Sequence, residues 1–136
     1  MFLEAKKVYE TYLDEIYKLE AEGVGDSLSP ELEAILSDKG VEVTFKGYSE
    51  AKKRKHRVLP LEKPYPDTQI KAERSADGQQ ITVYGCADIS AWRFTDSIDD
   101  KLIPGHIRRD RFVMERIDGD LIVIEVESDQ VESCHV

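Results

Sequence analysis

Cysteines and long apolar runs are scarce in this chain of 136 residues, and each shortage excludes a class of protein. Two cysteines with no Cys-x-x-Cys spacing cannot supply a four-ligand zinc site on their own, so we expect no metal, and nothing indicates a cofactor. No apolar run approaches the roughly 20 residues that a membrane span needs, and no signal-peptide pattern opens the sequence.

Positive charge is also in short supply. The chain has 19 Lys and Arg against 28 Asp and Glu, a formal net charge of −9. Generic nucleic-acid binding rests on a basic surface, so nucleic acid is not an expected partner. A hydrophobic content of 40% with no internal repeat favours a folded core. The length suits one domain of about 100–150 residues, which we assign to residues 1–136.

Two helices are expected at the start of the chain. Residues 1–22 carry one apolar stripe at helical spacing: Ala5, Val8, Tyr9, Tyr12, Leu13, Ile16 and Leu19. We place Glu20 on the outer face and favour core packing for the tyrosines, with Tyr12 kept as a candidate pocket residue. Ser29 and Pro30 are typical of the start of a second helix, which Gly40 would end.

From Val41 onward the apolar period changes to two. Alternation predicts a strand over 41–46, strands over 68–75, 80–90, 106–117 and 120–127, and tight turns at 76–79 and 118–119. Residues 47–67 are expected to form an edge strand and a loop, and residues 95–105 a polar loop. Helices followed by antiparallel strands predict an α+β fold, with two or three N-terminal helices packed on a strongly curved, mostly antiparallel sheet.

One segment carries a more specific resemblance. Val83, Cys86, Asp88, Ser90 and Trp92 match a V-x-x-C-x-D-x-S-x-W pattern, and a second cysteine follows at Cys134. This pattern, with the closing hairpin RDRFVMERIDGDLIVIEV, resembles the nuclear-transport-factor-like superfamily, which includes SnoaL-like and ketosteroid-isomerase-like domains. Within it, the pattern is similar to small domains of secreted actinobacterial proteins and lipoproteins. The resemblance implies a cone-shaped, cystatin-like roll.

The resemblance also bears on the two cysteines. By residue type alone, Cys86 and Cys134 are either a disulfide or two reduced thiols. The resemblance implies the disulfide, which would tie the C-terminal tail to a central strand. The compartment follows from this choice: extracytoplasmic with the disulfide, cytoplasmic without it.

Three residues are candidates for catalysis. Asp88 and Asp110 are candidates for a pair of carboxylates, with Tyr84 as a hydrogen-bond donor. Alternation places Tyr84 and Asp88 on the face of their strand opposite to the core residues. The interpretation we favour is therefore ion pairing of Asp88 or Asp110 with the arginines at 108, 109 and 111.

Two further features are candidates for binding. The basic patch consists of Lys52, Lys53, Arg54, Lys55 and Arg57. It is a possible contact for phosphate or an acidic surface, although a solvated loop or edge strand is the interpretation we favour. Trp92 either covers a ligand pocket or plugs the core.

These observations favour a non-enzymatic domain that binds a protein or a small apolar ligand, in or near the cell envelope. One alternative is a SnoaL-like isomerase, dehydratase or cyclase acting on a small apolar substrate. Another is an acidic inhibitor or immunity-type protein for a basic partner. A homodimer through the outer sheet face is left open.

Overall fold

The computed structural model describes residues 1–61, 68–97 and 102–134 and has an α+β fold. Four helices come first: α1 (Phe2–Glu22), α2 (Pro30–Ile35), α3 (Asp38–Gly47) and α4 (Ser49–Arg54). Seven strands follow: β1 (Arg57–Val58), β2 (Thr68–Arg74), β3 (Gln80–Asp88), β4 (Arg93–Thr95), β5 (Ile103–Pro104), β6 (Ile107–Ile117) and β7 (Asp120–Val131). The predicted fold class is confirmed.

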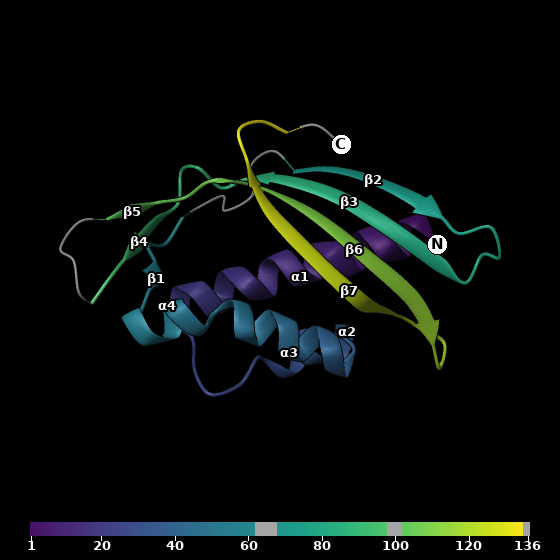
Figure 1. The fold of residues 1–136 in the computed structure, drawn as a ribbon, viewed down its shortest axis with the longest axis horizontal. Helices are drawn as coiled ribbons and strands as arrows, with labels where there is room; N and C mark the ends of the chain where they lie inside the picture. Colours follow the sequence, from purple (N-terminus) through teal and green to yellow (C-terminus); the bar gives the residue numbers. More distant parts are fainter. Residues whose placement is uncertain (62–67, 98–101, 135–136) are drawn as a thin grey trace.

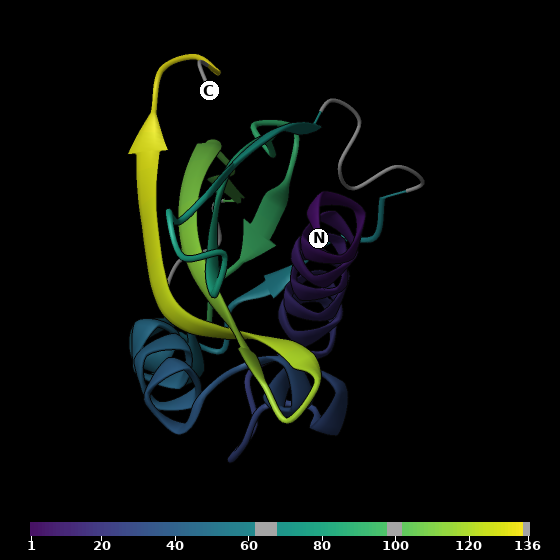
Figure 2. The same ribbon diagram turned by 90° about the vertical axis from the view of Figure 1, so that its right-hand side faces the viewer.

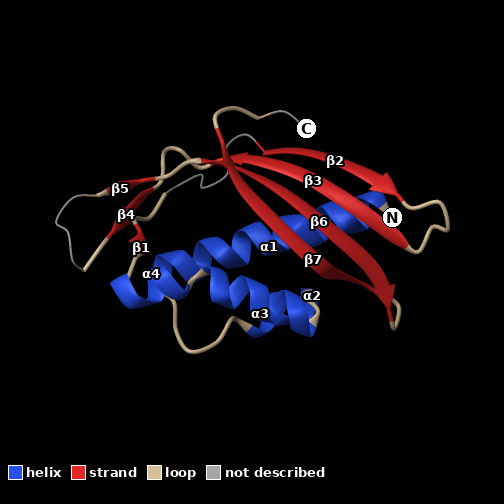
Figure 3. Ribbon diagram, viewed as in Figure 1, coloured by secondary structure: helices blue, strands red, loops and turns tan. Residues whose placement is uncertain are grey.

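The main sheet is antiparallel, with the strand order β2-β3-β6-β7. Helices α1 and α3 lie on one side of it (Figure 3). Strand β7 bends sharply along its length (Figure 2), and its pairing with β6 shifts register between Val113 and Met114. A β-bulge of this kind bends a strand and increases its local twist. The bend creates an inner face on which the helices pack.

The core fills the space between α1 and the inner face of the sheet. Helix α1 buries Ala5, Tyr9, Tyr12, Leu13 and Ile16, as its apolar stripe predicts. They meet Ile81, Val83, Phe112, Met114 and Val123 from the sheet and Leu32 from α2. No helix in the described part of the chain is long and apolar enough to cross a membrane.

A smaller sheet, with the order β1-β4-β5, lies beyond the end of β3 (Figure 1). It frames a second apolar cluster built from Val58, Ala87, Ile89 and Trp92. Part of the expected polar loop over 95–105 is therefore strand, and its residues 98–101 lie outside the described residues.

The strand expected over 41–46 is wrong. These residues belong to helix α3, whose N-cap Ser37 accepts a hydrogen bond from the backbone N–H of Gly40 at 3.0 Å. Val41 and Phe45 are four residues apart and pack against the core, whereas Val43 is exposed. The same residues satisfy a period of two and a period of 3.6, and the cap at Ser37 favours the helix.

The segment after α3 also differs from expectation. Residues 49–54 form helix α4 rather than an edge strand or loop, and Lys55 ends it in the left-handed conformation with φ 53°. Residues 62–67 of the loop expected before β2 lie outside the described residues. Both predicted turns are confirmed: Gly78 (φ 71°), and Asp118 and Gly119 (φ 51° and 90°), adopt the positive φ typical of tight hairpins.

Candidate functional site

A buried ion pair stands on the inner face of the sheet. Arg108 and Asp110 alternate inward along β6, and Arg108 Nη2 donates to Asp110 Oδ1 at 2.7 Å. Arg108 Nη2 also donates to Ser128 Oγ on β7 at 2.8 Å, and Ser128 Oγ donates to Asp110. Tyr9 on α1 donates from its hydroxyl to Asp110 Oδ2 at 2.6 Å. The buried charges are therefore paired and held by two further hydroxyls.

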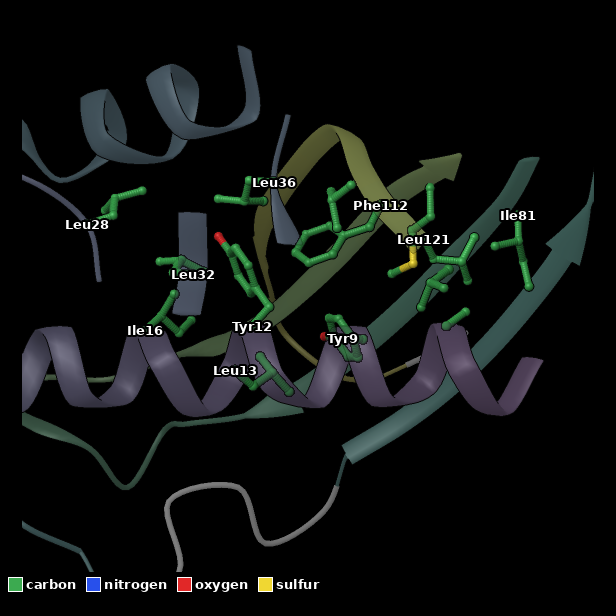
Figure 4. Close-up of a cluster of buried hydrophobic side chains, with 14 residues drawn as sticks. Tyr9, Tyr12, Leu13, Ile16, Leu28, Leu32, Leu36, Ile81, Phe112 and Leu121 are labelled. Atoms are coloured by element: carbon green, nitrogen blue, oxygen red, sulfur yellow. The ribbon is translucent and has the colours of Figure 1, made fainter. Parts of the chain in front are cut away.

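This network explains the role of Tyr9. Its whole side chain is buried, including the hydroxyl that donates to Asp110. The ring lies against Gly85, which is paired with Asp110 in the sheet register. Phe112 contacts the rings of both Tyr9 and Tyr12 edge to face, and Figure 4 shows Tyr12 beside Phe112.

A pocket of about 390 Å³ adjoins this pair, between α1, α3 and the strands β6 and β7, and we call it the polar pocket because most of its lining residues carry polar groups. Its lining includes Tyr12, Glu20, Val43, Thr44, Gly47, Tyr48, His106, Arg108, Val126 and Ser128. Two buried oxygens in it, Glu20 Oε2 and Thr44 Oγ1, have no hydrogen-bond partner among the described residues. Buried polar atoms are nearly always satisfied, so these two indicate a place for a bound molecule or water.

Glu20 is the acid in the pocket whose pKa is shifted from its ordinary value. The residue as a whole is partly exposed, but its carboxylate oxygen Oε2 is buried. Burial raises the pKa of Glu20 to about 7, against the lowering effects of a hydrogen bond from Tyr48 and of the charge on Arg108. A carboxyl with this pKa exchanges its proton near neutral pH.

The pKa values of the groups around Glu20 are also shifted. Burial raises the pKa of Tyr48 well above its usual value, and the nearby charge of Glu20 adds to this effect. Burial lowers the pKa of His106, with a further contribution from Arg108. His106 is therefore neutral at pH 7, and Glu20 is the group whose charge changes there.

A second, more apolar pocket of about 320 Å³ adjoins the first. The two share Glu20, Gly47, Tyr48 and His106. The second pocket adds apolar side chains from α4, the smaller sheet and the segment after α1: Val24, Ala51, Phe94, Ile103 and Pro104. Glu20 and Tyr48 thus stand between a polar compartment and an apolar one.

The pKa of Glu20 makes a prediction about stability. An acid whose pKa is about 7 in the folded state and about 4.3 in the unfolded state binds more protons when folded, so stability falls as the pH rises between those values. We expect Glu20→Gln to raise the free energy of unfolding by on the order of 2–3 kcal/mol at pH 8 and to change it little at pH 4.5.

The measurement is urea unfolding at both pH values, followed by the fluorescence of Trp92, the single tryptophan. Glu22→Gln, an exposed acid two residues further along, is the matched control and should change neither value. Equal effects of Glu20→Gln at pH 4.5 and pH 8 would contradict the raised pKa.

The structure separates Asp88 from the other two candidate catalytic residues. Asp88 accepts hydrogen bonds from the backbone N–H and the hydroxyl of Ser90 near the surface. Tyr84 and Asp110 both line a charged depression, together with Arg109 and Arg111. Asp88 is not part of that lining, so the three candidates do not form one site. The favoured ion pairing holds for Asp110, although its partner Arg108 lies on the same strand.

Of the two candidate pocket residues, Tyr12 and Trp92, one lines a pocket and the other does not. Tyr12 lines the polar pocket. Trp92 is 1% exposed and packs edge to face on Tyr17, so it plugs the second apolar cluster and does not cover either pocket.

Two residues of the basic patch form ion pairs with acidic residues of neighbouring segments. Lys52 pairs with Asp26 at 3.1 Å, and Arg54 pairs with Asp96 at 2.8 Å. His56 also contacts Asp96, at 3.0 Å. Lys53, Lys55 and Arg57 are exposed. Much of the charge in this run therefore anchors α4 to neighbouring segments.

Several of the pocket residues were not identified in the sequence analysis. Glu20 was assigned to the outer face of α1, but it follows Tyr12 and Ile16 at intervals of four residues and so continues the buried stripe. That spacing was the available signal. Tyr48 and His106 lie at the ends of elements, and no local pattern marks them as neighbours of Glu20.

The disulfide between Cys86 and Cys134 is present and ties the segment after β7 to β3 across 48 positions of sequence. Disulfides persist mainly in oxidising compartments, so this bond is a weak indication of an extracytoplasmic location. Among residues 1–61, 68–97 and 102–134, no group of three or more His, Cys, Asp or Glu is placed to hold a metal ion.

We expect loss of the disulfide to destabilise the fold. Cys134→Ser should lower the free energy of unfolding by roughly 2–4 kcal/mol, because the unfolded chain regains the freedom of a long loop. Urea unfolding of the variant and the native chain, with and without reductant, measures this. In excess reductant the two should coincide, and a difference that persists there would rule out the cross-link as the cause.

Comparison with known proteins bears on the fold alone. No protein-family model and no curated protein matches the sequence. The structure is similar to a crystal structure of the intermembrane space region of the chloroplast protein ARC6, with a TM-score of 0.63 and 10% sequence identity. The likeness covers 93% of this chain and 95% of the other. The two chains share a fold.

Proposed function

We propose that this chain is a non-enzymatic binding domain that takes a small molecule into the paired pockets beside Glu20. The observation that carries the proposal is the polar pocket of about 390 Å³, in which Glu20 Oε2 and Thr44 Oγ1 are buried with no hydrogen-bond partner among the described residues. Its apolar neighbour gives a ligand with both polar and apolar parts a place to lie. Ligand sites commonly combine an apolar lining with a few convergent polar groups.

The remaining parts of the proposal concern family and location. We place the chain in the nuclear-transport-factor-like superfamily, supported by helices packed on a bent antiparallel sheet and by a disulfide between the two cysteines that the resemblance pairs. We place it in the cell envelope or another extracytoplasmic compartment, supported by the same disulfide.

An enzyme is the second candidate, and Glu20 favours it. A carboxyl with a pKa of about 7, beside the neutral His106 and the hydroxyl of Tyr48, has the properties of a proton-transfer group. The candidate acid or base is then Glu20, in place of Asp88. If the chain is an enzyme, Glu20→Gln should remove turnover of its substrate. If it is a binding domain, the native chain should leave its ligand chemically unchanged.

The binding proposal is tested by NMR with a library of small fragments. We expect backbone amide shifts at residues lining the paired pockets, such as Gly47, Tyr48 and His106, at fragment concentrations near 1 mM. The matched variant Thr44→Trp should fill the polar pocket and abolish these shifts, while Lys39→Trp, at an exposed position of the same helix that lines neither pocket, should not. The proposal fails if every fragment that binds does so elsewhere.

A further inference from the structure

We infer that the ligand is a small organic cation, with an ammonium head that pairs with Glu20 Oε2 and an apolar body that lies in the adjoining pocket. This inference rests on the proposed function and names the chemistry of its ligand. The carboxylate oxygen is buried at the junction of the two pockets and lacks a partner among the described residues.

The charges around Glu20 favour a cation. Arg108 is the cation of the pocket, but it forms an ion pair with Asp110 at 2.7 Å and also donates to Ser128, so its charge is compensated. His106, which directly precedes β6, is neutral because burial lowers its pKa. Tyr12 and Tyr48 keep their protons at neutral pH, since burial raises both of their pKa values.

Two further acidic residues line the pockets and add negative charge near Glu20. Asp129 lies at the rim of the polar pocket, paired with Arg109 at 3.6 Å, and Glu50 lines the apolar pocket. His56 lines the apolar pocket too and contacts Asp96. When Glu20 is ionised, Tyr48 and the paired Arg108 offset its charge only in part, and its oxygen Oε2 has no hydrogen-bond partner among the described residues. An anion would meet this carboxylate, whereas an ammonium would neutralise it.

The apolar pocket selects the body of the ligand. Val24, Phe94 and Ile103 line it, and Tyr48 lines both pockets. A volume of about 320 Å³ admits a single aromatic ring with room to spare. An aryl or alkyl group there is removed from water, while the ammonium one or two bonds away reaches Glu20 and faces the Tyr48 ring.

The test compares three probes of nearly equal shape: benzylamine, benzyl alcohol and benzoate. NMR titration at pH 8, where Glu20 is ionised, should show benzylamine binding at least about tenfold more tightly than the alcohol, with shifts at Tyr48 and His106, and benzoate not binding. At pH 5.5, where Glu20 is protonated, the preference for benzylamine should shrink to about threefold or less.

Two variants isolate the carboxylate. Glu20→Gln should remove the preference for benzylamine over benzyl alcohol, while Glu22→Gln, on the exposed side of the same helix, should keep it. Equal binding of the amine and the alcohol, or tighter binding of benzoate, would overturn the cation inference and leave the binding function standing. If no fragment of any charge shifts the pocket residues, the proposed function fails as well.

Discussion

Replacing Arg108 by methionine is expected to lower the free energy of unfolding by about 3–5 kcal/mol. Asp110 is 1% exposed, and Arg108 supplies it with bonds from both Nε and Nη2. Methionine keeps the apolar stem of the arginine but lacks its guanidinium group, so Tyr9 and Ser128 are the side-chain partners left to the Asp110 carboxylate among the described residues. Removing one partner of a buried pair strands a charge, which costs far more than the pair itself contributes.

Two further variants separate this effect from a general loss of charge. Arg109→Met changes the next residue, whose side chain is 51% exposed and pairs with Asp129 at 3.6 Å, and should cost less than about 1 kcal/mol. The double variant Arg108→Met with Asp110→Leu should recover most of the loss, since no charge is left buried. Urea unfolding of all three by Trp92 fluorescence measures this. A single Arg108→Met variant as stable as Arg109→Met would refute the argument.

The sequence was informative where a local pattern decides the structure. Along β3 and the residue after it, the set predicted to face inward is buried: Ile81, Val83, Gly85, Ala87 and Ile89. Cys86, from the opposite set, is buried as well. Both Asp-Gly turns form where they were expected, because few residues other than glycine, asparagine and aspartate adopt positive φ. Local periodicity and turn chemistry were sufficient for the α+β class.

The prediction failed where two periods fit the same residues. Val41, Val43 and Phe45 satisfy alternation, but Val41 and Phe45 also fit one face of a helix. The residues that decide between them, the N-cap Ser37 and the buried Thr44, carry little weight in a count of apolar positions. Helix α3 forms one wall of the pocket, so this error hid the site.

The site itself depends on contacts that no local pattern encodes. Tyr9 reaches Asp110 across 101 positions of sequence, and Ser128 reaches Asp110 across 18. Ion pairing of Asp110 was anticipated, but its burial and its two hydroxyl partners follow from the packing of α1 on the sheet. Glu20 is the exception. Its spacing from Tyr12 and Ile16 indicates the buried face of α1, although it was assigned to the outer face in the sequence analysis.

That packing depends on a single glycine, so Gly85→Ala is expected to cost on the order of 4 kcal/mol. A Cβ atom at position 85 would lie 2.2 Å from Cζ of Tyr9, far inside contact distance. The Tyr9 side chain is fully buried, so the ring can move aside only by displacing its neighbours in the core. Relieving the clash moves the ring away from Phe112 and breaks its hydrogen bond to Asp110. The cost then approaches that of removing a buried aromatic side chain.

A double-mutant cycle isolates the clash. In a Tyr9→Ala background the obstacle is gone, so adding Gly85→Ala should change stability by less than about 1 kcal/mol, and the two substitutions should be strongly non-additive. Gly25→Ala is the matched control, because no atom lies within 4 Å of the Cβ that it would add. Urea unfolding by Trp92 fluorescence measures each step. Additive losses would mean that Gly85 serves the backbone of β3 itself, whereas strong coupling would establish that its missing side chain is what lets α1 bring Tyr9 to the Arg108–Asp110 pair.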